Sequence, residues 1–174
     1  MRSLLLFLTL PLFILDQATK QWAVTRFAPP SEFHHDYLTV IPGFFDLVRV
    51  HNTGVAFGMA NGAPGANYIF GAVSLGALAF IAWLWRTGAF PTRLSRVAVA
   101  LLISGVCGNF VDRVFRGYVV DFLSLDLKFM QWPAFNVADA AICIAATCLF
   151  LSAFQKPPAA GPAAPCGPAR RPPG

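Results

Sequence analysis

Near its C-terminal end the chain reads Ala134-Phe-Asn-Val-Ala-Asp-Ala-Ala-Ile-Cys-Ile-Ala-Ala-Thr-Cys-Leu-Phe-Leu-Ser-Ala-Phe154, and Asp139 is the only charged residue in this run. A helix needs about 20 mostly apolar residues to cross the hydrocarbon layer of a bilayer, and this run is long enough. An ionised carboxylate in such surroundings is costly and is rarely kept without a task. The run therefore predicts a membrane-spanning helix that carries a functional acid.

Three further apolar runs precede this one: Ser3 to about Ala23, Tyr68 to Trp85, and Val97 to Val111. Hydrophobic residues make up 56% of the chain and charged residues only 12%, about half the charged fraction of a soluble domain. A cleavable signal peptide is the alternative for the first run, but that run leads into Asp16-Gln-Ala-Thr-Lys20 and not into a small-residue cleavage site. We therefore expect an all-α membrane domain of residues 1–155, with four transmembrane helices at about residues 3–23, 68–86, 96–113 and 134–154.

The distribution of basic residues predicts the orientation. If there are four crossings, one side carries seven basic residues and no acidic residue: Arg2, Arg86, Arg93, Arg96, Lys156, Arg170 and Arg171. By the positive-inside rule this side is cytoplasmic, so both termini are expected there. The net charge of +5 then reflects topology, and no basic stripe with interleaved aromatic residues points to nucleic acid.

The first outward segment, about residues 28–66, is expected to form a small antiparallel β-sheet on the outer membrane surface. Tyr37 to Ile41 and Phe44 to Val50 are rich in β-branched and aromatic residues, and Pro42-Gly43 between them favours a turn.

The second outward segment, Arg116 to Pro133, is shorter and carries Asp121. Trp132-Pro133 is expected to mark the interface and to begin the fourth helix, because proline fits a first helical turn. The proline-rich residues 156–174 are expected to form a disordered cytoplasmic tail.

Polar residues gather at the outer ends of the predicted helices. Asp16 and Lys20 share a helix face at i and i+4, and Asn109, Asp112 and Arg113 end the third helix. Asn136 and Asp139 are placed in the fourth helix, with Asp139 about 8 Å below its start. Antiparallel neighbours bring these ends into one layer, so the carboxylates should meet at the outer leaflet boundary.

These residues fall in five short motifs: Asp16-Gln-x-Thr-Lys20, Asn52-Thr-Gly-Val-Ala-Phe-Gly58, Gly108-Asn-Phe-Val-Asp-Arg113, Val119-Val-Asp-Phe122 and Phe135-Asn-x-Ala-Asp139. In this order and with near-identical spacing they resemble the motifs of lipoprotein signal peptidase (signal peptidase II), over about residues 5–150. The resemblance implies an aspartic intramembrane peptidase of the bacterial cytoplasmic (inner) membrane. Such an enzyme cuts diacylglyceryl-modified prolipoproteins just before the lipid-bearing cysteine.

Carried over residue by residue, the resemblance places the catalytic aspartates at Asp121 and Asp139. The residues expected to support the site or bind substrate are Asn52, Gly54, Asn109, Asp112, Arg113 and Asn136. Asp16 and Lys20 match the first motif as a structural polar pair. No metal or cofactor is expected, and the partners implied are prolipoprotein substrates and membrane lipid, with the protein itself a monomer.

The chemistry follows from the two carboxylates. When two carboxyl groups lie close together, one pKa rises and the pair shares a proton. The ionised member can then deprotonate a water while the protonated member polarises the scissile carbonyl. Asp112 is the rival for one role, but Arg113 beside it favours a salt-bridged structural part. Helix–helix adhesion is the alternative explanation for the polar residues as a group.

Two other functions fit the sequence less well. A proton-coupled transporter would place its acids near the midplane on broken helices, whereas here they cluster at one surface. Nothing in the sequence favours a non-enzymatic scaffold. His34-His35-Asp36 and His51 match no metal-ligand spacing and are expected to be solvated. Cys107, Cys143 and Cys148 are expected to pack as small apolar residues, and Cys166 lies in the tail.

Overall fold

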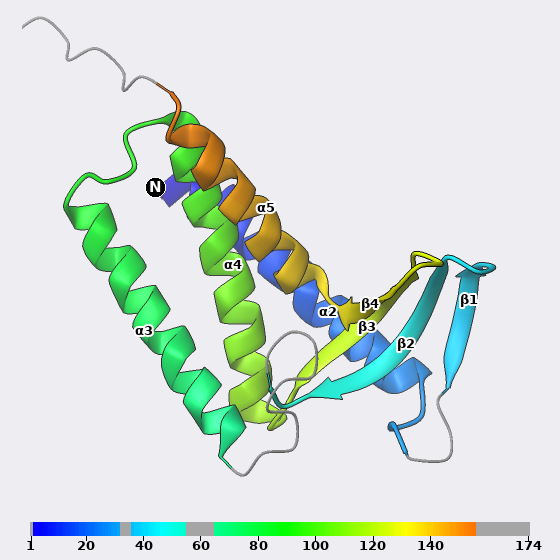
Figure 1. Ribbon diagram of the computed structural model, residues 1–174. Coiled ribbons are helices and arrows are strands. Elements are labelled where there is room, and N and C mark those ends of the chain that lie inside the picture. Colours follow the sequence, from blue (N-terminus) through cyan, green and yellow to red (C-terminus); the bar gives the residue numbers. More distant parts are fainter. Residues whose placement is uncertain (1, 32–35, 55–64, 156–174) are drawn as a thin grey trace, which may run out of the picture.

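The computed structural model describes residues 2–31, 36–54 and 65–155, which form a group of long helices with a four-stranded antiparallel sheet at one end (Figure 1). In chain order the elements are α1 (Arg2–Leu4), the π-helical turn η1 (Leu5–Thr9), α2 (Leu10–Arg26), β1 (Tyr37–Ile41), β2 (Phe45–Asn52), α3 (Ala66–Arg86), α4 (Arg93–Phe115), β3 (Val119–Asp126), β4 (Gln131–Phe135) and α5 (Val137–Ser152). The expected tail of residues 156–174 lies outside these ranges.

Helices α2, α4 and α5 pack together, and α3 lies beside α4 (Figure 1). The close approach of α4 to its neighbours depends on two glycines. A Cβ at Gly105 would lie against the Ala138 carbonyl oxygen of α5, and one at Gly108 would lie 2.5 Å from Asp16 Oδ2 of α2. Small residues allow helix backbones to approach in this way inside a membrane.

Two of the helices, α3 and α4, are long and apolar enough to cross a bilayer, whereas α5 is apolar but has only 16 residues. Helix α3 exposes Ile69, Phe80 and Trp83 by more than half of their surface. Exposed side chains of this kind are expected where lipid is the solvent.

The predicted start of the fourth helix at Ala134 is wrong. Trp132 and Pro133 lie in β4, and Asn136 caps α5, which begins at Val137. Asp139 is therefore the third residue of its helix and not about 8 Å below the start. The reason is the cap: the Asn136 side chain accepts a hydrogen bond from the Asp139 backbone N–H, which stabilises a helix start at this residue.

The sheet is larger than the hairpin expected from residues 37–50. The hairpin is present as β1 and β2, with Gly43 at a φ of +69° in the turn, where glycine is favoured. Strands β3 and β4 lie within residues 119–135 and complete the order β1-β2-β3-β4.

The β2–β3 pairing sets Asn52 opposite Val119 and Val50 opposite Asp121. One face of the sheet packs on the C-terminal part of α2, where Ala23 and Phe27 contact Val120 and Phe122. This packing holds the strand that carries Asp121 against the ends of the helices.

Candidate active site

The two predicted catalytic carboxylates come from different elements and share a neighbour. Asp121 lies on β3 and is 2% exposed, while Asp139 lies in the first turn of α5 and is partly buried. Asn136 Nδ2 donates to Asp121 Oδ1 at 2.7 Å, and its backbone N–H donates to Asp139 Oδ2 at 3.2 Å. One residue thus bridges both carboxylates, because the capping position lies between the sheet and the helix.

Asn52 holds the other side of Asp121. Its Nδ2 donates to Asp121 Oδ2 at 3.0 Å, and its Oδ1 accepts from the Gly54 backbone N–H at 3.0 Å. The Gly54 carbonyl in turn accepts from Arg113 Nη2 at 3.3 Å. The segment after β2 is thereby joined to α4 next to the acid pair.

Asn109 of α4 holds Asp139. Its Nδ2 donates to Asp139 Oδ1 at 2.7 Å, while its Oδ1 accepts from Lys20 Nζ at 2.9 Å and from Asn136 Nδ2 at 3.2 Å. Each carboxylate therefore receives hydrogen bonds from two N–H groups.

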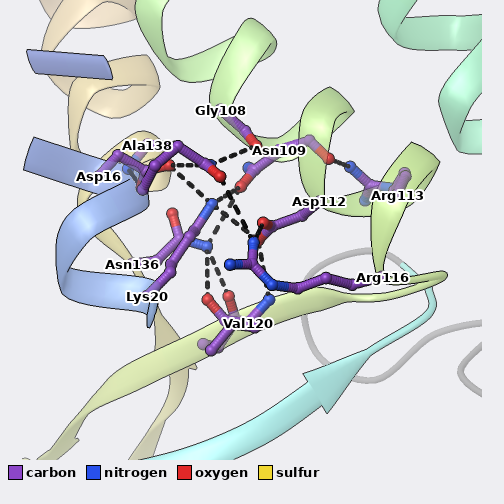
Figure 2. Close-up of polar contacts among 12 residues, drawn as sticks. Asp16, Lys20, Gly108, Asn109, Asp112, Arg113, Arg116, Val120, Asn136 and Ala138 are labelled. Carbon is purple, nitrogen blue, oxygen red and sulfur yellow. Dashed lines mark hydrogen bonds and ion pairs between the residues drawn. The ribbon is translucent and has the colours of Figure 1, made fainter. Parts of the chain in front are cut away.

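A buried ion network lies around Lys20 and Asp112, next to Asn109 and Asn136 (Figure 2). Lys20, which is 0% exposed, contacts Asp16 Oδ2 at 2.9 Å and Asp112 Oδ2 at 3.1 Å, and Arg116 pairs with the other oxygen of Asp112. Asp112 Oδ2 also accepts from the Val120 backbone N–H at 3.1 Å. The network connects α2, α4 and β3, and burial makes each of its charges dependent on its partners.

The expected partner of Asp112 is therefore wrong. Asp112 pairs with Lys20 and Arg116, while the Arg113 side chain turns away to Asn109 and Gly54 carbonyl oxygens. Arg116 lies at i+4 from Asp112 on α4, a spacing that places two side chains on one helix face. This spacing could have identified Arg116 as the partner of Asp112, but Arg116 was not among the site residues predicted from the sequence.

Asp16 also reaches α5. Its Oδ1 accepts from the Ala138 backbone N–H at 2.8 Å, and Gln17 Nε2 donates to the Gly108 carbonyl at 3.1 Å. Asp16 and Lys20 thus form the polar pair expected from the sequence and join three helices beside the site.

Burial changes the proton affinity of Asp121. Removal from water, with the nearby charge of Asp139, raises the pKa of Asp121 to about 7 despite the hydrogen bonds from Asn52 and Asn136. A carboxyl group of this kind keeps its proton near neutral pH and can act as an acid.

A cleft of about 280 Å³ leads to Asp139 and to Asn52, the residue that hydrogen-bonds to Asp121. One wall is α3, and the others are α4, α5 and the ends of β2 and β3. Its polar lining includes Asn52, Asn109, Arg113 and Asp139, and its apolar lining includes Phe70, Val73, Ala77, Val106 and Ile142. The cleft is therefore apolar along the helices and polar where Asp139 lies.

Arg113 has an unused donor at this cleft. Its guanidinium lies over the Phe70 ring at 5.8 Å, and its buried Nε has no hydrogen-bond partner among the residues that the structure describes. A buried unpaired N–H is costly, so a hydrogen-bond partner for this donor is expected. Phe70, like Ser74 of the same helix, was not predicted as a site residue because α3 carries no motif.

The histidines do not form a second site that the structure can describe. His34 and His35 lie outside the described residues. His51 is not solvated as expected, because it is half-buried on β2 and stacks on Tyr118 at 3.7 Å. Burial and the charge of Arg49, whose Nε donates to His51 Nε2, lower the pKa of His51 to about 4. Arg49 also donates to the Val24 and Phe27 carbonyls and so fastens β2 to the end of α2.

The chain is similar to known proteins over most of its length. The family model described as signal peptidase (SPase) II matches residues 8–155. A lipoprotein signal peptidase of Syntrophotalea carbinolica is 40% identical over 154 residues, which is 88% of this chain and 92% of the relative. One of Pseudoalteromonas atlantica is 34% identical over 151 residues, 86% of this chain and 88% of the relative.

The fold of this chain is also similar to solved structures. Two structures of a bacterial membrane enzyme superpose with a TM-score of 0.75 each, at 27% and 26% identity. They match 86% and 87% of this chain and 87% and 92% of their own.

Proposed function

Because the chain belongs to the signal peptidase II family of membrane proteases, which remove signal peptides from lipoproteins, we propose that it is an aspartic endopeptidase whose catalytic pair is Asp121 and Asp139. Its substrates are diacylglyceryl-modified prolipoproteins, cut just before the lipidated cysteine. The observation that carries the proposal is that Asn136 hydrogen-bonds to both carboxylates, of which Asp139 lines the polar end of an apolar cleft.

The pair divides the chemistry between base and acid. Each carboxylate accepts two N–H groups, but Asp139 also lies in the first turn of α5, where the helix dipole favours a negative charge. Burial and the charge of Asp139 favour the protonated form of Asp121. Asp139 takes a proton from water as the water oxygen attacks the scissile carbonyl carbon. Asp121 gives its proton to the carbonyl oxygen. When the C–N bond breaks, Asp139 returns its proton to the leaving amine, and the new carboxylic acid restores the proton on Asp121.

Arg113 is the donor proposed to bind the substrate backbone. The side-chain N–H groups of Asn52 and Asn136 already serve Asp121, while Arg113 lines the cleft and its buried Nε has no partner among the described residues. A substrate carbonyl placed there would complete its hydrogen bonding. Asn52, Gly54, Asn109 and Asp112 act by holding the pair and the guanidinium in place.

The proposal also includes the location of the enzyme and its orientation in the membrane. The enzyme acts as a monomer in the bacterial cytoplasmic membrane with four crossings and both termini in the cytoplasm. The sheet then lies on the outer surface, and the acid pair lies near the outer leaflet. The apolar part of the cleft, formed by Phe70, Val73 and Ile142, would receive lipid chains of the substrate.

Cleavage of a purified prolipoprotein tests the function directly. The full chain in detergent micelles is mixed with a diacylglyceryl-modified prolipoprotein, and products are identified by mass spectrometry. The matched control is the same prolipoprotein with the modified cysteine replaced by serine. We expect a cut immediately before the lipidated cysteine and none in the control. No cleavage of the lipidated substrate by the folded protein would refute the function, and equal cleavage of both substrates would refute the lipid requirement.

A further inference from the structure

Lys20 does not line the cleft, but its three N–H donors all contact polar residues that lie next to the acid pair. The ammonium contacts Asp16 Oδ2, Asp112 Oδ2 and Asn109 Oδ1 at 2.9, 3.1 and 2.9 Å. An ammonium group has three N–H donors and no acceptor, so this set of partners is complete. With the side chain 0% exposed, water cannot substitute for a lost partner.

The contact with Asn109 determines which end of its amide faces Asp139. Because an ammonium only donates, the oxygen of Asn109 must point toward Lys20, and the N–H₂ group then points toward Asp139. Asn136 Nδ2 donates to the same oxygen at 3.2 Å and favours the same orientation. The reversed amide would set N–H against the ammonium and oxygen against the carboxylate, two repulsive contacts in a buried site.

We propose that Lys20 is a positioning residue of the reaction, which acts through Asn109 to keep a hydrogen-bond donor on Asp139 and so keeps Asp139 ionised as the base. This inference rests on the proposed roles of Asp121 and Asp139. It assigns to the first motif a part in the reaction in addition to holding helices together.

The charges around the pair are consistent with this role. Four carboxylates, Asp16, Asp112, Asp121 and Asp139, face three cations, Lys20 of α2 and Arg113 and Arg116 of α4. One carboxylate is therefore left to hold a proton, as a pair that shares one requires. Arg49 and His51 of β2 bond to each other and Arg49 to the end of α2.

The double variant Lys20→Met/Asp16→Asn separates positioning from stability. Removing Lys20 alone would leave buried carboxylates unpaired and could unfold the protein. The double variant removes one cation and one anion, and the new amide oxygen at position 16 can still accept from the Ala138 N–H. We expect a Tm near that of the wild type, an unchanged KM, and a kcat about 10- to 100-fold lower, because the oxygen of Asn109 then keeps only the weaker contact from Asn136.

Two further readouts test whether the effect passes through Asn109. The acidic limb of the pH–rate profile should move to higher pH, since Asp139 then loses part of its support as the ionised base. In an Asn109→Ala background the same double substitution should cause little further loss of kcat. Arg116→Met is the control: it removes a cation from Asp112 but contacts neither Asn109 nor Asp139, so it should lower Tm and leave the acidic limb in place.

Asn109→Asp tests the second contact of the inference, the hydrogen bond from Asn109 to Asp139. This variant keeps an acceptor for Lys20 but loses the donor to Asp139, so it should fold and have a low kcat. A folded double variant with the wild-type kcat and pH profile, or an Asn109→Asp enzyme with the wild-type kcat, would overturn the inference. Asp139→Asn is assayed in parallel, because cleavage by that variant would refute the proposed catalytic pair, on which the role of Lys20 rests.

Discussion

Replacing Asp121 with asparagine should make the folded protein more stable at neutral and alkaline pH. In the folded chain the pKa of Asp121 is raised from 3.8 to about 7 by burial and by the charge of Asp139. Between these two values the folded state holds a proton that the unfolded chain has released. The free energy of unfolding therefore falls as pH rises through this window, and the loss is complete above about pH 7.

The magnitude follows from the size of the shift. A rise of this size corresponds to about 4 kcal/mol. The substitution removes that penalty, but the new amide would set one N–H₂ group against Asn52 Nδ2, and the lost hydrogen bond costs about 1–2 kcal/mol. The net gain at pH 8 is then about 2–3 kcal/mol, or roughly 5–10 °C in Tm for a chain of this length.

Thermal unfolding in detergent, followed by tryptophan fluorescence from pH 5 to 8.5, measures this effect. The variant's advantage in Tm should grow as pH rises. Asp126→Asn, at the exposed end of the same strand, is the control for removing a charge as such. If wild type and Asp121→Asn differ by the same Tm at pH 5 and at pH 8, Asp121 does not hold a proton in the folded state and the reasoning fails.

Three other predictions test separate parts of the structure. Gly108→Ala should lower the free energy of unfolding by about 1–3 kcal/mol, because the new Cβ would meet Asp16. The control is Gly76→Ala on α3, whose Cβ meets nothing within 4 Å and should not destabilise the protein. Equal effects of the two substitutions in thermal unfolding would contradict the close packing at Gly108. Arg113→Lys keeps the charge but removes the unpaired Nε–H, so kcat should fall about 100-fold while Tm is retained. A wild-type kcat in this variant would refute the proposed role of Arg113 in substrate binding. The kcat/KM for the lipidated substrate should fall as pH rises through about 7, as the proton on Asp121 is lost; a flat profile between pH 6 and 8.5 would contradict its role as the acid.

Much of the fold could be predicted because its signals are local. The apolar runs at residues 68–86 and 96–113 became α3 and α4, and the turn at Pro42-Gly43 became the β1–β2 hairpin. The pairing of β2 with β3 could not be predicted, since it joins segments about 70 residues apart and depends on a register that no local pattern specifies.

The start of α5 is a case where two signals competed. Trp132-Pro133 suggested an interfacial helix start, but Asn136 with Asp139 three residues later has the spacing of a reciprocal cap. The cap prevailed because it satisfies backbone N–H groups that the helix start leaves open. The same residues also bridge the acid pair, so the feature that set the helix boundary is part of the candidate site.

For the site, the motifs predicted which polar residues gather but not how they pair. The structure brings together the ten residues expected from the sequence, while the partners of Asp112 are Lys20 and Arg116 rather than Arg113. Sequence spacing places Arg113 next to Asp112, but consecutive residues on a helix point in different directions, whereas residues four apart share a face.

The most direct test of the central claim compares cleavage of a diacylated prolipoprotein by the wild type, Asp121→Asn, Asp139→Asn and Asp112→Asn. Asparagine is nearly the same shape as aspartate but can neither take up a proton as a base nor give one up as an acid. We predict that the first two variants fold and release no signal peptide, while Asp112→Asn, whose carboxylate serves Lys20, Arg116 and the Val120 N–H, retains measurable cleavage. Cleavage that survives in Asp121→Asn and is lost in folded Asp112→Asn would contradict the assignment of the catalytic pair.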